Sequence, residues 1–249
     1  GVQTCALPIL DTNDEWITQR IGVRSRHISE TETNVDMAVK AAERALENAG
    51  ISADELDLII ATTITGDTLS PGTGCMVQNR IGAHCPAFDL AAACSGFLFA
   101  LETAAGFLSR GAYNRVLVVS AERMSGIIDW TDRGTCCIFG DGAGAVVLKA
   151  SSDPGILAAR MYADGDYGEK VLSLTASLNH GVISGDPYIR MDGRQVFRLA
   201  VEGLVGSARE VADLACVHTE DVALFVPHQA NLRIMTMVAA KLGIPEERM

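Results

Sequence analysis

The sequence has 249 residues, of which 48% are hydrophobic and 20% charged, and its formal net charge is −11 at pH 7. This length suits one large domain or two fused smaller ones, and the composition excludes a disordered chain. The acidic balance argues against nucleic acid or an anionic membrane as the general partner.

Helical and strand patterns alternate along the chain. In chain order, the patterns predict a helix at 34–48, a strand at 58–62, a helix at 75–81, a strand at 88–90, a helix at 95–110, strands at 115–120, 146–148 and 155–162, a helix at 193–214, a strand at 222–226 and a helix at 231–242. Continuously apolar strands between helices indicate an α/β fold whose sheet is covered on both faces. A second round of elements begins after about residue 152, which suggests two halves.

The seven cysteines do not suggest a disulfide framework, because their number is odd and their spacing irregular. No CxxC pair is present, so we expect no metal site. Except for Cys94, each cysteine is expected to be a small buried hydrophobe. No apolar run reaches the roughly 20 residues that span a bilayer. Residues 1–10 lack the basic region of a secretory signal, so the expected compartment is the cytoplasm.

A glycine-rich run, Phe139–Ala145, invites a nucleotide-binding interpretation. However, the run leads into a strand, whereas a dinucleotide-binding loop opens a helix. Close backbone packing is the better explanation of these glycines.

Cys94 is the strongest candidate for chemistry, because it lies between a predicted strand and a predicted helix. Backbone N–H groups and the helix dipole favour an anion at such a junction, so we expect a lowered thiol pKa and a nucleophilic thiolate. This predicts an enzyme that carries an acyl group on sulfur.

His228 is the best candidate partner of Cys94, since it directly follows the predicted strand 222–226 and sites form at the carboxyl ends of strands. The other histidines lie in polar or loop contexts and are expected to be structural: His27, His84, His180 and His218. A papain-like cysteine hydrolase is a weak rival, because its Cys-Gly-Ser-Cys-Trp motif is absent.

Several segments together resemble β-ketoacyl-acyl carrier protein synthase III, an enzyme with a thiolase fold. The matching segments, in order, are Asp14–Ile17, Ala91–Phe97, Asp132–Thr135, Phe139–Ala145, Met191–Gly193 and Pro227–Ile234. Their joint order and spacing carry the resemblance, which runs from about residue 11 to residue 249. It implies a leader at 1–10 that matches nothing, an N-terminal thiolase-like half with the nucleophile at 11–152 and a partial C-terminal half with the histidine at 153–249.

The resemblance implies that Cys94 takes an acyl group from acyl-CoA and passes it to malonyl-acyl carrier protein, starting type II fatty acid synthesis. Decarboxylation would place negative charge on the malonyl thioester oxygen, where neutral His228 could donate a hydrogen bond. No cofactor is implied, because the CoA thioester is a substrate. The implied assembly is a homodimer.

Further residues match binding positions of the family. For CoA these are Thr12, Trp16, Arg20, Arg133, Gly193 and Asn231. An indole and a guanidinium can sandwich adenine, and arginine suits phosphate. For docking of the acidic carrier protein they are Arg198, Arg233 and Lys241.

The family's catalytic asparagine, in a Gly-Asn-Thr-Ser segment, would lie beyond Met249, together with a Gly-rich loop and the last strands. We therefore expect this polypeptide alone to expose apolar surface, to dissolve poorly and to condense little. The alternatives are a thiolase-fold condensing enzyme of polyketide or quinolone synthesis, and a fragment that only binds acyl-CoA or carrier protein.

Overall fold

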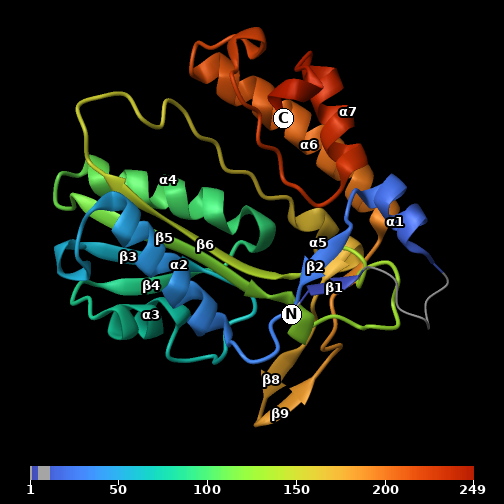
Figure 1. The fold of residues 1–249 in the computed structure, drawn as a ribbon, viewed down its shortest axis with the longest axis horizontal. Coiled ribbons are helices and arrows are strands. Elements are labelled where there is room, and N and C mark those ends of the chain that lie inside the picture. Colours follow the sequence, from blue (N-terminus) through green and yellow to red (C-terminus); the bar gives the residue numbers. More distant parts are fainter. Residues whose placement is uncertain (1, 5–11) are drawn as a thin grey trace. The chain divides into compact units, whose positions relative to one another are not determined.

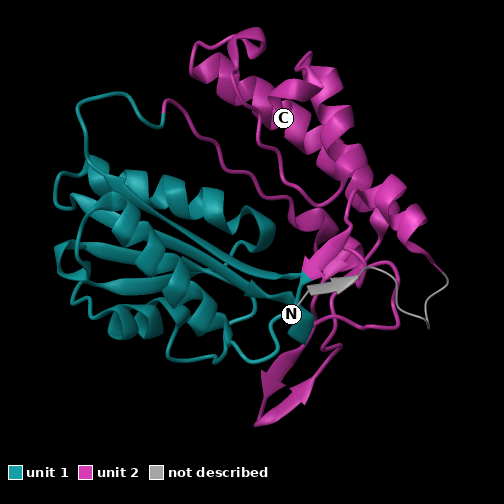
Figure 2. Cartoon of the chain, viewed as in Figure 1, with its two compact units in different colours: residues 1, 27–126, 140–156 teal, residues 2–26, 127–139, 157–249 magenta. Residues whose placement is uncertain are grey.

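A computed structural model describes residues 2–4 and 12–249, and these form two compact units (Figure 2). Unit 1 comprises 27–126 and 140–156, and unit 2 comprises 2–26, 127–139 and 157–249. The predicted halves at 11–152 and 153–249 stay a prediction. Of the predicted leader, only residues 2–4 lie within the described part, where they form β1 (Val2–Thr4).

Unit 1 is a four-stranded sheet with helices on both faces. Its elements are α2 (Asn34–Ala49), β3 (Leu58–Thr62), α3 (Thr73–Ile81), β4 (Ala87–Leu90), α4 (Gly96–Ser109), β5 (Arg115–Arg123) and β6 (Asp141–Lys149). The strand order is β4-β3-β5-β6, and only β6 runs antiparallel to its neighbour. Figure 1 shows α4 on one face of this sheet and α2 and α3 on the other.

Alternate side chains of the central strands enter two separate cores. Ile59 and Ala61 of β3 pack with α2 and α3, whereas Leu58 and Ile60 pack with α4. All five residues of β3 are buried. The predicted strands 58–62, 88–90, 115–120 and 146–148 and the cover on both faces are therefore confirmed.

Local capping defines the helix ends. Thr33 and Asp36 form a capping box at the start of α2, and Gly50 ends the helix in the left-handed conformation, with φ of 66°. Asp89 of β4 accepts hydrogen bonds from the backbone N–H groups of Thr73 and Gly74, at 2.7 and 2.6 Å. This carboxylate serves as the missing cap of α3 and ties that helix to β4.

Unit 2 is built mainly from helices. Its helices are α1 (Asp14–Ile21), α5 (Gly168–Val171), α6 (Gly193–Leu214) and α7 (Leu232–Leu242), and its paired strands are β7 (Leu172–Ser173) with β10 (Arg190–Met191) and β8 (Ser177–Asn179) with β9 (Val182–Ser184). Strand β1 pairs with β2 (Ser25–His27). One apolar core joins α6 to α7, and α1 also packs against α7. None of the helices within the described ranges is long and apolar enough to cross a membrane.

Two predicted strands, at 155–162 and 222–226, are wrong. Residues 155–162 and 222–226 have no regular secondary structure, and Leu157, Leu224 and Val226 are 61%, 63% and 69% exposed. A strand needs a neighbour for its backbone, and neither segment pairs with another strand in the described part of the chain. Arg248 holds the second segment instead, since its carbonyl accepts from the Phe225 N–H at 2.7 Å.

Two smaller expectations also need correction. The glycine run enters β6 at Asp141, and a Cβ at Gly142 or Gly144 would meet no atom within 4 Å, so close packing does not explain these two glycines. Among the cysteines, Cys136 and Cys137 are fully buried as expected, but Cys75 and Cys216 are exposed. Cys5 lies outside the described residues.

The close approach of α4 to β3 predicts a large cost for Gly96→Ala. A Cβ at Gly96 would lie 2.0 Å from Oγ1 of buried Thr62, so strand or helix must shift. We expect a loss of about 1–3 kcal/mol in the free energy of unfolding, measured by urea denaturation.

Gly106→Ala is the matched control on the same helix, because a Cβ there meets nothing within 4 Å. We expect this variant to gain up to about 1 kcal/mol from helix propensity. Equal effects of the two substitutions would contradict the packing argument.

Candidate active site

The Cys94 thiol lies where the chain turns from β4 into α4. A short 3-10 turn, Ala93–Ser95, joins the two elements. Ala93 has φ of 45°, the left-handed region that residues with a Cβ rarely adopt. The turn leaves the Cys94 side chain exposed. A strained backbone at an exposed nucleophile is a recurrent feature of functional sites.

Glu122, near the end of β5, accepts hydrogen bonds from the loop that follows β3. Its carboxylate accepts from the Ile64 N–H at 2.9 Å and from the hydroxyls of Thr63 and Thr65. Burial raises the pKa of this carboxyl group above its usual value, although the hydrogen bonds act in the opposite direction. β3, β4 and β5 run parallel, so Thr63, Cys94 and Glu122 all follow or end strands at one edge of the sheet.

The expected lowering of the Cys94 pKa is wrong. Burial by surrounding protein raises the pKa of this thiol although its side chain reaches solvent, and the negative charge of Glu122 raises it further. A hydrogen bond from the backbone of Cys94 itself acts in the opposite direction but does not dominate. Cys94 is therefore a protonated thiol at neutral pH, and its reaction as a thiolate requires a proton acceptor.

His228 lies in unit 2, three residues before the N-cap of α7. Burial by the surrounding protein lowers the pKa of its imidazole, although the residue is exposed to solvent. The lowered pKa keeps the ring neutral at neutral pH, so one ring nitrogen can donate and the other accept a hydrogen bond. Because Cys94 belongs to unit 1, the pairing of these two groups stays a prediction.

The structure brings Trp16 and Arg133 together, 117 positions apart in the sequence. The Arg133 guanidinium carbon lies 5.7 Å from the centroid of the Trp16 ring, which is 41% exposed. This distance is within the range of a cation–π contact. Arg20 is exposed in the last turn of α1, the helix that carries Trp16. An aromatic face and cationic groups thus lie close together in unit 2.

The other predicted CoA residues have local structural roles of their own. Asn231 is the N-cap of α7, and its side-chain oxygen accepts from the Arg233 N–H at 2.9 Å. Gly193 is the first residue of α6. The buried Oγ1 of Thr12 has no hydrogen-bond partner within the described ranges.

The predicted docking residues all lie on the two packed helices of unit 2. Arg198 is exposed on α6, and Arg233 and Lys241 are exposed on α7. The Arg233 guanidinium carbon lies 5.8 Å from the centroid of the Phe197 ring, next to Arg198. Arg233 of α7 therefore contacts α6 at Phe197, the residue that precedes Arg198.

Glu122 is the site residue that sequence reasoning missed. It lies 28 positions after Cys94, inside an apolar strand, and only the strand order shows that the two are close enough to interact. The sequence offered one indication of Glu122, its residue type, because a carboxylate is rare at the end of a buried strand.

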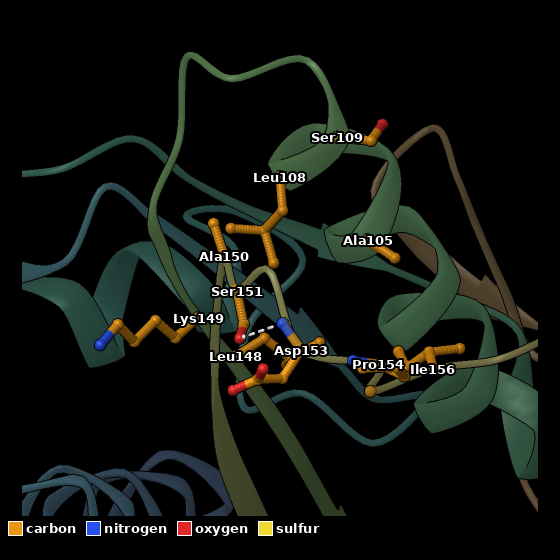
Figure 3. Close-up of a pocket in the computed structure, with 11 residues that line it drawn as sticks. Ala105, Leu108, Ser109, Leu148, Lys149, Ala150, Ser151, Asp153, Pro154 and Ile156 are labelled. Carbon is orange, nitrogen blue, oxygen red and sulfur yellow. Dashed lines mark hydrogen bonds between the residues drawn. The ribbon is translucent and has the colours of Figure 1, made fainter.

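A pocket of about 550 Å³ lies between α4 and the segment that follows β6 (Figure 3). Its lining includes Leu108, Leu148 and Ile156, and the Asp153 N–H donates to Ser151 Oγ at 3.0 Å. None of the candidate site residues lines it. Across the described residues, no group of three or more histidine, cysteine or acidic side chains could hold a metal ion.

The chain matches two models of a known protein family and a relative from that family. The family model for 3-oxoacyl-[acyl-carrier-protein] synthase III matches residues 88–165, and the model for the C terminal part of that family matches 213–249. The chain is 49% identical over 241 residues to a β-ketoacyl-[acyl-carrier-protein] synthase III of Bordetella petrii, covering 96% of this chain and 73% of that protein.

Solved structures show the same likeness. A 3-oxoacyl-[acyl-carrier-protein] synthase III from Aquifex aeolicus matches with a TM-score of 0.92 at 46% identity, over 100% of this chain and 79% of that one. The priming β-ketosynthase of the R1128 polyketide pathway matches with a TM-score of 0.88 at 40% identity, over 97% and 73%. The thiolase-like fold is confirmed by these neighbours.

The electrostatic role of Glu122 predicts that Glu122→Gln makes Cys94 more reactive. At pH 8–9 the carboxylate is ionised and repels the thiolate, so its removal lowers the thiol pKa and raises the alkylation rate at a given pH. Iodoacetamide labelling across a pH series, followed by peptide mass spectrometry, measures this rate for each cysteine.

Exposed Cys216, in unit 2, is the internal control and should label equally in both proteins. Unchanged or slower labelling of Cys94 in the variant would show that Glu122 does not set its pKa.

Proposed function

Because the chain belongs to the 3-oxoacyl-[acyl-carrier-protein] synthase III family of condensing acyltransferases, we propose that Cys94 carries the acyl group of a decarboxylating Claisen condensation. The substrates are an acyl-CoA, with acetyl-CoA as the expected starter, and malonyl-acyl carrier protein. The product is 3-oxoacyl-acyl carrier protein, which starts type II fatty acid biosynthesis. The observation that carries this proposal is the exposed thiol on the strained turn between β4 and α4.

In the first step the Cys94 thiol loses its proton and attacks the carbonyl of the acyl-CoA thioester. The CoA thiolate leaves, takes up a proton and is released as CoA. The raised pKa of Cys94 makes a proton acceptor necessary, and neutral His228 is the proposed acceptor.

In the second step malonyl-acyl carrier protein loses CO2, and the electrons of the broken bond form a thioester enolate. His228, neutral again, donates a hydrogen bond to the enolate oxygen. The enolate carbon attacks the acyl-Cys94 carbonyl, and the Cys94 sulfur leaves as a thiolate that takes up a proton from solvent, which restores the thiol. An imidazole with a lowered pKa suits this role, because it remains neutral at the pH at which the enzyme works.

The Trp16 and Arg133 pair is the proposed site for the CoA nucleotide. The indole offers a flat face to adenine, and Arg133 and Arg20 offer charge to phosphates. Thr12, Gly193 and Asn231 are proposed to line the path of the pantetheine arm. Asn231 has its oxygen engaged as a helix cap, so its amide N–H groups are the part that could contact substrate.

We further propose a homodimer in the cytoplasm that needs no cofactor. Nucleic acid and membrane are not among the proposed partners, given the net charge of −11.

A second candidate function is priming of polyketide synthesis. The likeness to the R1128 priming β-ketosynthase, at 40% identity, favours it. The two functions differ in the acyl starter and the extender carrier, so activity with malonyl-acyl carrier protein of fatty acid synthesis discriminates between them.

The role of Cys94 predicts that incubation with acetyl-CoA adds one acetyl group to the chain and that Cys94→Ala abolishes this addition. Intact-mass and peptide mass spectrometry measure both. Cys216→Ala, which removes another exposed cysteine, is the matched control and should still be acetylated.

Acetylation elsewhere, or none, would contradict the acyl-enzyme. Exposure of the acetylated chain to malonyl-acyl carrier protein or malonyl-CoA then separates the fatty acid reaction from related condensations. A chain that binds both substrates without acylation would be a binding protein only.

The proposed CoA site predicts that Arg133→Ala weakens CoA binding roughly tenfold, because one stacked charge is lost. Isothermal titration calorimetry with CoA measures the dissociation constant. Arg110→Ala removes an exposed arginine of unit 1 outside the site and should leave it unchanged. Equal affinities of the two variants would place CoA elsewhere.

A further inference from the structure

Arg209 is a basic residue on α6 that neither the sequence patterns nor the family resemblance singled out. Its Nη2 donates a hydrogen bond to the Lys241 carbonyl oxygen at 2.9 Å. This carbonyl belongs to the last turn of α7, so the contact places a positive charge at the negative end of that helix. Arg209 of α6 therefore contacts α7 at Lys241, just as Arg233 of α7 contacts α6 at Phe197.

The contacts of Arg233 with Phe197 and of Arg209 with Lys241 show how the basic residues are arranged along the two helices. Along α6, Phe197 precedes Arg209, and along α7, Arg233 precedes Lys241, so the two helices run in the same direction (Figure 1). Arg198 and Arg209 are eleven positions apart, close to three full turns, and so lie on the same side of α6 about 16 Å apart. Arg233 and Lys241 span about 12 Å of α7.

We use the name basic ridge for four exposed residues of these two helices, Arg198, Arg209, Arg233 and Lys241. Glu210, next to Arg209, is engaged by Arg160 at 3.3 Å and by the Tyr162 hydroxyl. Over the described ranges, none of the four ridge residues forms an ion pair, although Glu202 and Asp213 also lie on α6. The ridge is thus a local positive strip on a chain of net charge −11.

We propose that Arg209 is an additional docking residue for the acidic carrier protein, completing the far end of this ridge beside Lys241. The proposal rests on the proposed function. An acidic protein is the occupant that a group of exposed basic residues on a chain of net charge −11 favours, because the attraction is local. Arg209 also lines a polar hollow of about 260 Å³ with Asp213, His218 and Thr219, so part of its guanidinium faces open space.

The test measures binding of fluorescently labelled holo-acyl carrier protein to the 249-residue chain by anisotropy at low ionic strength. Arg209→Glu should weaken binding roughly three- to tenfold, the range expected for surface charge contacts. Arg44→Glu makes the same charge change at an exposed site on α2 and should leave binding unchanged. The loss with Arg209→Glu should shrink as salt is raised.

Two further variants separate charge from a structural role at the end of α7. Arg209→Lys keeps the charge and should bind as the wild type does, whereas Arg209→Gln should bind more weakly while its thermal unfolding stays unchanged. Equal weakening by Lys and Gln would overturn the proposal, because it would show that the hydrogen bond to Lys241 and not the charge matters.

The outcomes distinguish this inference from the proposed function. If Arg233→Glu weakens binding but Arg209→Glu acts no more than Arg44→Glu, Arg209 is not a docking residue and the docking proposal stands. If the wild-type chain does not bind carrier protein, or binds anionic lipid vesicles through Arg209 instead, both proposals fall.

Discussion

The two-sided burial of β3 and β5 is the constraint on which the site depends. Strands covered by helices on both faces are mainly apolar, and β3 is buried at all five positions, four of them apolar and the last Thr62. Parallel pairing of β3 with β4 and β5 then brings three strand ends to one edge of the sheet. Cys94, Thr63 and Glu122 lie at this end of the sheet.

That edge gives Cys94 a fixed position but not an activated thiol. The helix start offers backbone N–H groups, yet burial and the Glu122 carboxylate together outweigh them and raise the thiol pKa. The N-terminus of α4 therefore lowers the pKa of Cys94 less than the sequence led us to expect, because its effect is confined to the first turn and competes with desolvation.

The helices could be predicted from sequence because their determinants are local. The apolar period of 34–48 and the glycines at 50 and 243 describe α2 and α7 almost to the residue. Strands depend on partners that the period does not reveal, and the apolar runs at 155–162 and 222–226 lack such partners within the described ranges. The raised pKa of Cys94 was equally out of reach, because Glu122 is remote in sequence and only folding brings it near.

Helix packing in unit 2 explains how a few basic residues act together on an acidic chain. The shared core of α6 and α7 keeps their axes at a fixed offset, so residues at different positions in sequence become neighbours in pairs. The Phe197 ring contacts the Arg233 guanidinium, and the Lys241 carbonyl oxygen accepts a hydrogen bond from the Arg209 guanidinium. A side chain held in this way loses less conformational freedom when a partner docks than a free arginine would. For the proposed docking, the rigidity of the helix pair would therefore contribute beside the charges, and a basic strip of equal charge on flexible loops would bind the same acidic surface less tightly.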